Sequence, residues 1–158
     1  MDTRIKTERP RWTPQARVYH YAVDNLINKI KDDILDFGSG KARYWEKKLG
    51  RKNYHIDSYD LSLTDRTLRP YYKVILVSNV LNVQETRDQL RETIKQIIGF
   101  AKSGTRIVWN YPSPRKMPTL TSDDMEWLIE FWGQDQDFTV LTNALKGDQA
   151  GLYVTTLI

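Results

Sequence analysis

Polar residues follow three apolar stretches of the sequence, and their spacing is typical of a ligand site. Residues 36–40 read Asp-Phe-Gly-Ser-Gly, residues 58–60 read Ser-Tyr-Asp, and residues 78–79 read Ser-Asn. Glycines two positions apart allow a tight turn and let a ligand approach the backbone, because they carry no Cβ. A simple turn between buried elements would also explain the glycines alone. Their combination with polar residues after the next two apolar stretches favours a site.

Two acids lie at the distance from the glycines at which an acid can accept hydrogen bonds from ribose hydroxyls. That distance is roughly 20 residues in nucleotide-binding α/β units. Asp60 lies 24 residues and Asp57 lies 21 residues after Asp36, so both are candidates. Each acid taken alone could equally be a solvated turn residue. Together with the glycine turn, they predict a ligand that contains ribose.

The elements that must position these residues alternate between strand and helix. The β-branched run at 72–78 is typical of a strand covered on both faces. The predicted strands are residues 33–37, 54–59, 72–78, 105–111, 138–141 and 152–157; the predicted helices are residues 14–30, 41–49, 85–101 and 121–132, with a loop at 112–118. This order predicts an α/β fold with a mostly parallel sheet and right-handed crossovers, closed by an antiparallel C-terminal pair. We expect the polar strand ends to line one crevice.

Length and composition predict one globular domain. The chain has 158 residues, of which 40% are hydrophobic and 28% charged. We expect residues 1–13 to form a flexible arm and residues 14–158 a single domain. The absence of cysteine excludes disulfides and thiolate nucleophiles, and with two histidines we expect no histidine-built metal site. The composition fits a cytoplasmic protein, since no secretory leader or membrane span is recognisable.

The charge distribution suggests an anionic partner. Residues 1–117 carry a net charge of +10 and residues 118–158 a net charge of −6. A basic surface could track the phosphates of DNA or RNA, although a solvated helix face would have the same composition. The candidate phosphate contacts are Lys41, Arg43, Lys47, Lys48, Arg51 and Lys52.

Residues 36–40, 58–62 and 78–83 together resemble motifs of the class I S-adenosylmethionine (SAM)-dependent methyltransferases. Asp-Phe-Gly-Ser-Gly resembles their first motif, Asp/Glu-x-Gly-x-Gly, and Ser-Tyr-Asp-Leu-Ser resembles the second. Ser-Asn-Val-Leu-Asn-Val resembles the segment after the fourth strand of that family. The closest subgroup is the methyltransferases associated with DNA phosphorothioation, which share the Val-Leu-Asn-Val phrase. The resemblance covers residues 14–111.

The resemblance implies SAM as cofactor and a minimal Rossmann-like methyltransferase fold. It places Asp36, Gly38, Ser39 and Gly40 at the methionine end of SAM and the acid of the second motif, Asp60, at the ribose. Leu61 would lie beside the cofactor. Asn79 and Val80 would flank it from the opposite wall.

The sequence also departs from the family pattern. Only 12 residues separate Asp60 from Lys73, too few for a helix–strand–helix crossover, so the family's third strand is expected to be reduced or missing. The third glycine of the first motif is Ala42, and the Asp/Asn-Pro-Pro-Tyr signature of DNA amino-methyltransferases does not follow Val77. No general base is assigned. The crevice candidates by location are Tyr19, His20, Tyr21, Asn82 and Tyr111.

Three hypotheses follow. The first is a SAM-dependent methyltransferase, with a nucleic acid as the acceptor suggested by charge. The second is a catalytically inactive module of the same fold that binds nucleic acid or a protein partner. The third, another nucleotide-binding enzyme such as a dehydrogenase, is disfavoured because Arg43 stands where the dinucleotide fingerprint has its third glycine.

Overall fold

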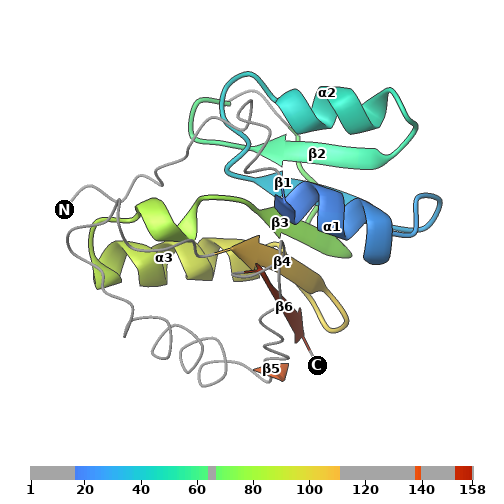
Figure 1. The fold of residues 1–158 in the computed structure, drawn as a ribbon. Helices are drawn as coiled ribbons and strands as arrows, with labels where there is room; N and C mark the ends of the chain where they lie inside the picture. Colours follow the sequence, from blue (N-terminus) through green and yellow to red (C-terminus); the bar gives the residue numbers. More distant parts are fainter. Residues whose placement is uncertain (1–16, 64–66, 111–137, 140–151, 158) are drawn as a thin grey trace.

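The computed structural model describes residues 17–63, 67–110, 138–139 and 152–157. Within these residues, helices pack on a six-stranded sheet (Figure 1). The strand order is β2-β1-β3-β4-β6-β5. The first four of these strands are parallel, and β6 is antiparallel to both β4 and β5. Their bounds are β1 Asp33–Phe37, β2 His55–Tyr59, β3 Val74–Val77, β4 Arg106–Asn110, β5 Phe138–Thr139 and β6 Leu152–Leu157. The predicted mostly parallel sheet with an antiparallel C-terminal strand is therefore confirmed.

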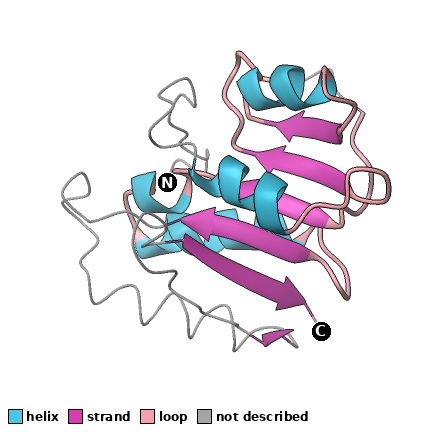
Figure 2. Cartoon of the chain, turned by 45° about the vertical axis from the view of Figure 1, so that its right-hand side comes forward, coloured by secondary structure: helices cyan, strands magenta, loops and turns pink. Residues whose placement is uncertain are grey.

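Helices cover both faces of the sheet, as Figure 2 shows. Helices α1 (Arg17–Asn25) and α2 (Tyr44–Gly50) bury their apolar side chains against one face. Helix α3 (Arg87–Ile98) buries Leu90, Ile94 and Ile97 against the other. All four side chains of β3 are buried, as expected for a central strand covered on both sides.

A short connection joins β2 to β3 without a strand of its own in the residues that the structure describes. Strand β2 is therefore an edge strand of the sheet, in agreement with the prediction that the family's third strand is reduced or missing. Tyr72, at the end of this connection, contacts Phe100, with ring centroids 6.2 Å apart. Phe37, Tyr59 and Phe100 contact one another, with ring centroids 5.0–6.4 Å apart. The hydroxyl of Tyr72 donates to Asp57 Oδ2 over 2.7 Å. This aromatic cluster covers the apolar face beside β2 on the α3 side of the sheet.

All three described helices are shorter than the periodicity predicted: α3, for example, spans Arg87–Ile98 rather than residues 85–101, since the Thr86 side chain caps its start and Gly99 follows its end. Helix α1 ends at Asn25 rather than Ile30, and Asn28 Oδ1 instead accepts the N–H groups of Ile30 and Lys31. Such side-chain bonds offer the backbone an alternative to the helix. Helix α2 begins at Tyr44 rather than Lys41, because Arg43 has a left-handed backbone with φ of 52°.

Several predicted segments lie outside the described residues. They are the arm at 1–13, the loop at 112–118 and the helix at 121–132. The predicted antiparallel pairing of the last two strands is confirmed for the residues described, since Phe138 pairs with Leu157.

A buried hydrogen bond ties β6 to the parallel part of the sheet and predicts a loss of stability on mutation. Trp109 Nε1 donates to Thr155 Oγ1 over 2.9 Å, and both residues are fully buried. Thr155→Val keeps the shape but removes the acceptor, so we expect the free energy of unfolding to fall by about 1–3 kcal/mol. Urea denaturation measures this loss. Thr156→Val, at the next and partly exposed position, is the control and should change stability by less than about 0.5 kcal/mol.

Candidate functional site

The polar residues singled out by the sequence lie at the carboxyl ends of neighbouring parallel strands, which we call the carboxyl edge. Asp36 of β1 pairs in register with Ser58 of β2 and Leu76 of β3. The chain runs from β1 to β2 on one side of β1 and then crosses to β3 on its other side. The strand order thus reverses between β1 and β3, and open α/β sheets bind ligands at such a reversal. The glycine turn after β1 and Asn79 after β3 lie on its two sides.

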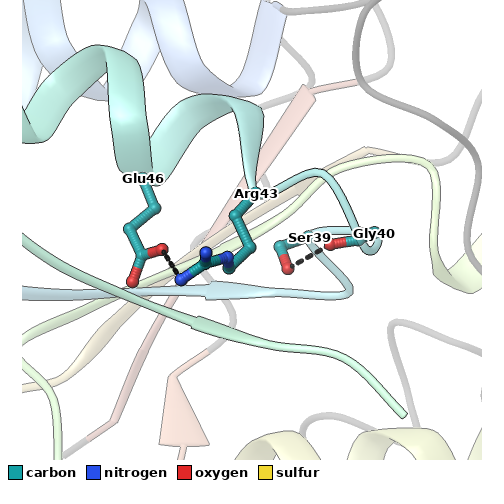
Figure 3. A network of polar contacts seen from close by, with 4 residues as sticks. All are labelled: Ser39, Gly40, Arg43 and Glu46. Atoms are coloured by element: carbon teal, nitrogen blue, oxygen red, sulfur yellow. Dashed lines mark hydrogen bonds and ion pairs between the residues drawn. The ribbon is translucent and has the colours of Figure 1, made fainter. Parts of the chain in front are cut away.

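The glycine turn is tied to the end of β2 by its own backbone. The N–H groups of Gly38 and Ser39 both donate to the carbonyl oxygen of Tyr59, over 2.8 and 3.1 Å. The N–H of Gly40 donates to Asp60 Oδ1 over 3.1 Å. Gly38 and Gly40 have φ of 78° and 74°, a conformation that glycine adopts without strain. The side-chain interactions of the turn are local: Ser39 Oγ donates to the carbonyl of Gly40 (Figure 3).

These bonds argue against a dinucleotide site. A pyrophosphate is bound by free backbone N–H groups of the glycine turn at the start of a helix. Here three successive N–H groups of the turn already donate to β2 and the residue after it. Moreover, α2 begins only at Tyr44, after the left-handed Arg43, whose side chain forms the 3.3 Å ion pair with Glu46 that Figure 3 shows. The arrangement therefore suits a ligand without phosphate groups.

The two candidate acids on and after β2 have different surroundings. Asp57 lies within β2 and accepts a hydrogen bond from Tyr72, on the side of the aromatic cluster. Asp60 lies at the carboxyl edge, where Oδ2 accepts from the N–H and the hydroxyl of Ser62 over 3.0 and 2.5 Å. Asp60 is 8% exposed. The geometry thus places Asp60, and not Asp57, beside the glycine turn.

Asp36 is completely buried beneath α1. Its Oδ1 accepts a hydrogen bond from the Tyr19 hydroxyl over 2.7 Å, and no described residue donates to its Oδ2. Burial raises the pKa of Asp36 to about 7; the bond from Tyr19 lowers this pKa, whereas the negative charges of Glu46 and Asp60 raise it further. Tyr19 in turn stacks on Trp45 of α2, with ring centroids 4.4 Å apart. A buried carboxyl group with one unpaired oxygen is costly unless a donor or a cation pairs with it.

Two asparagines join the ends of β3 and β4. The N–H of Asn79 donates to Asn110 Oδ1 over 2.7 Å, and Asn110 Nδ2 donates to Asn79 Oδ1 over 2.8 Å. Asn79 has a left-handed backbone with φ of 54°. Asn110 is not among the cofactor-binding residues that the sequence predicted. The signal that identified Asn79, a polar residue at the end of a buried strand, applies equally to Asn110.

The remaining candidates are distributed more widely. Val80 packs in the core on the α3 side, so its side chain faces the core. Leu61 is 41% exposed, His20 is exposed, and Asn82 is buried. Tyr21 packs against the apolar cluster beneath α1, and Tyr111 lies outside the described residues.

The six basic residues do not form one surface around the carboxyl edge. Helix α2 connects two parallel strands, so it runs from the carboxyl edge back to the opposite end of the sheet. Lys41 lies near the carboxyl edge, whereas Arg51 and Lys52 precede the start of β2 at the opposite end. Arg43 pairs with Glu46, and Lys48 Nζ lies 4.7 Å from the centroid of the Trp45 ring.

The part of the chain that the structure describes has neither a cluster of metal-ligating side chains nor a membrane-spanning helix. Its residues contain no group of three or more His, Cys, Asp or Glu placed to hold a metal ion. Among the described helices, none has the length and apolar character needed to cross a membrane.

No protein-family model and no curated protein matches the sequence. Among solved structures, the N-methyltransferase NodS from Bradyrhizobium japonicum WM9 is similar, with a TM-score of 0.58 and 14% identity over 92% of this chain and 98% of NodS. A second is the 1,6-didemethyltoxoflavin-N1-methyltransferase of Burkholderia thailandensis, with bound S-adenosylhomocysteine (SAH): TM-score 0.59, 12% identity, 94% of this chain and 81% of that chain.

The 16S rRNA methyltransferase RmtF, in complex with SAH, is also similar, with a TM-score of 0.54 and 12% identity over 92% of this chain and 63% of RmtF. At such low identities these likenesses show the fold. The chain has the Rossmann-like fold of the SAM-dependent methyltransferases, as its motifs predicted. A specific link to the methyltransferases associated with DNA phosphorothioation is not among these similarities.

The buried pair Tyr19–Asp36 predicts a pH-dependent loss of stability in Tyr19→Phe. Because the folded-state pKa of Asp36 is near 7 and its ordinary value near 4, this group's contribution to stability falls as pH rises from about 4 to about 7. The Tyr19 hydroxyl stabilises the ionised form. Its removal should cost about 1.5–3 kcal/mol at pH 8 and roughly 1 kcal/mol at pH 5.

Urea denaturation at the two pH values measures this difference. Tyr21→Phe is the control on the same helix, because the Tyr21 hydroxyl bonds to no described residue, and it should show no pH-dependent loss. Equal losses for Tyr19→Phe at both pH values would contradict the prediction.

Proposed function

We propose that this protein is a SAM-dependent methyltransferase. The observation that carries the proposal is the glycine turn whose N–H groups are bound to Tyr59 and Asp60 at the reversal point of the strand order. A ligand there meets glycines and carboxylates, while the N–H groups that would hold a phosphate are already engaged. SAM is a nucleoside with cationic sulfonium and ammonium groups and no phosphate. The methyltransferase fold and the neighbours that bind SAH support the same ligand.

In this proposal each part of the carboxyl edge has one role. Asp36, Gly38, Ser39 and Gly40 hold the methionine half, and the unpaired Oδ2 of Asp36 is the acceptor for the ammonium group. Asp60 accepts hydrogen bonds from the ribose hydroxyls, and the partly exposed Leu61 lies against the adenine. Asn79 and Val80 form the opposite wall, Val80 through its backbone because its side chain is in the core.

Bound SAM would supply an electrophilic methyl group to a nucleophilic acceptor and would leave as SAH. The protein's contribution to such a transfer is mainly the alignment of the acceptor with the methyl group. No general base is assigned among the described residues, which fits an acceptor that is already nucleophilic.

For the acceptor we propose a nucleic acid. The support is the basic charge of residues 1–117 and the similarity to RmtF, which is described as a 16S rRNA methyltransferase. NodS and the toxoflavin enzyme are N-methyltransferases, so the fold itself accommodates different acceptors. The alternative is a catalytically inactive module that binds nucleic acid or protein. It would bind SAH weakly or not at all and would transfer no methyl group.

The ribose role of Asp60 predicts a selective loss of cofactor affinity. Asp60→Asn removes the charge that strengthens hydrogen bonds to ribose, so binding of SAH should weaken by about 1–3 kcal/mol. Isothermal titration calorimetry of the wild type and the variant measures this loss. Asp57→Asn is the matched control: it changes the other acid, which is engaged with Tyr72, and should leave the affinity unchanged.

Three outcomes of this titration would count against the assignments. A wild-type protein that binds neither SAM nor SAH at millimolar concentration would refute the cofactor proposal. Loss of affinity in Asp57→Asn alone would move the ribose role to Asp57. Unchanged affinity in both variants would remove both acids from the site.

The nucleic-acid proposal predicts that charge reversal acts locally. Lys41→Glu, near the carboxyl edge, should weaken binding to DNA or RNA and reduce the slope of log K against log salt by about 0.7–0.9 for each phosphate that is no longer neutralised. Lys52→Glu makes the same change in net charge at the opposite end of the sheet and should have the smaller effect. Fluorescence anisotropy with labelled single- and double-stranded oligonucleotides measures both. Equal effects of the two variants would indicate unspecific attraction by net charge.

A further inference from the structure

The asparagine pair that joins β3 to β4 is a buried, doubly hydrogen-bonded group of the carboxyl edge. Asn79 and Asn110 are 8% and 6% exposed, and they lie 31 residues apart in the sequence. Two hydrogen bonds of 2.7 and 2.8 Å link them, one of them from the backbone of Asn79. The left-handed φ of Asn79 is one that asparagine tolerates better than most residues. The pair is thus a built feature and not a chance surface contact.

The backbone N–H of Asn79 determines the orientation of both side-chain amides. An N–H group can only donate, so the atom of Asn110 that faces it must be the oxygen, Oδ1. The other end of the Asn110 amide is then the donor Nδ2, and the atom of Asn79 that faces it must be Oδ1. It follows that the NH₂ group of Asn79 points away from the pair. Its Nδ2 donates to no residue that the structure describes.

The position of Asn79 brings this donor to the proposed cofactor site. Asn79 follows β3, and β3 pairs directly with β1, the strand that leads into the glycine turn. Asn79 and the turn therefore lie on the two sides of the point where the strand order reverses. A ligand bound at that point lies between them.

We propose that Asn110 is a positioning residue that holds Asn79 with its NH₂ group directed at the cofactor. There the NH₂ group donates a hydrogen bond to a lone-pair atom, either a carboxylate oxygen of the methionine half or a ring nitrogen of adenine. This inference rests on the proposed function. One wall of the site thus carries a hydrogen-bond donor, the NH₂ group of Asn79, which recognises an acceptor on the cofactor. The backbone N–H of Asn79 fixes the amide of Asn110, and Asn110 in turn prevents the Asn79 amide from turning over.

Reversing this polarity tests the inference. In Asn110→Asp one carboxylate oxygen still accepts from the N–H of Asn79, but the other has no hydrogen to donate. The amide of Asn79 then turns over to donate to the new carboxylate, and it presents Oδ1 to the cofactor. Two acceptors would face one another, so the affinity for SAH should fall by at least about tenfold. Asn79→Asp also presents an acceptor to the cofactor, this time from the other residue, and should give a similar loss.

Asn79→Gly is the uncharged control. Glycine keeps the backbone N–H and adopts the left-handed φ without strain, so this variant removes the donor without adding a charge. We expect a smaller loss of SAH affinity, about threefold to tenfold. The same titrations with 5′-methylthioadenosine, which lacks the methionine carboxylate, identify the partner atom. If the losses persist, the partner is adenine; if they disappear, it is the carboxylate.

Amide NMR of the ligand-free protein gives a readout that a merely structural role of Asn110 would not move. In the wild type, the NH₂ group of Asn110 should be protected from solvent exchange and that of Asn79 should exchange freely. In Asn110→Asp, the NH₂ group of Asn79 should become protected. If Asn110→Asp and Asn79→Asp bind SAH with the affinity of the wild type, this inference is wrong, whereas the proposed function still stands. Absence of wild-type SAH binding would refute the proposed function on which it depends.

Discussion

The candidate site depends on the hydrogen bonds between the glycine turn and the end of β2. The carbonyl oxygen of Tyr59 accepts two N–H groups of the turn, and Asp60 accepts a third. These bonds hold the ends of two parallel strands together and fix Asp60 beside the glycines. They also engage three N–H groups of the turn that could otherwise donate to a ligand. The same hydrogen bonds thus give the edge its shape and reduce the donors left for a phosphate.

The second constraint is the short connection from β2 to β3. A full methyltransferase fold covers this region with a further helix and strand, whereas here the rings of Phe37, Tyr59, Tyr72 and Phe100 cover it. The Tyr72 hydroxyl also donates a hydrogen bond to Asp57, so the side chain of Asp57 is engaged on the side of the aromatic cluster. Asp60, which directly follows β2, is the acid beside the glycine turn.

Buried polar groups at the carboxyl edge are held by partners from distant parts of the chain. Asp36 keeps a raised pKa under α1, with Tyr19 as its partner. Asn79 keeps a left-handed backbone with Asn110 as its partner. Burial of such groups costs stability unless they are hydrogen-bonded. In the proposed function, the unpaired Oδ2 of Asp36 and the unpaired Nδ2 of Asn79 obtain their partners from the cofactor.

The sequence by itself determined the strands, the order of helices and strands, and the glycine motif, because hydrophobic periodicity and glycine spacing are local properties. It also predicted the reduced third strand, since chain length limits what a connection can contain. Only the tertiary structure decided between the positions of Asp57 and Asp60, paired Asn79 with Asn110, and placed Lys41 and Lys52 at opposite ends of the sheet. The physical reason is that these relations depend on strand register and on the direction of α2. Contacts between residues 15 to 31 positions apart decide them, and no local pattern encodes those contacts.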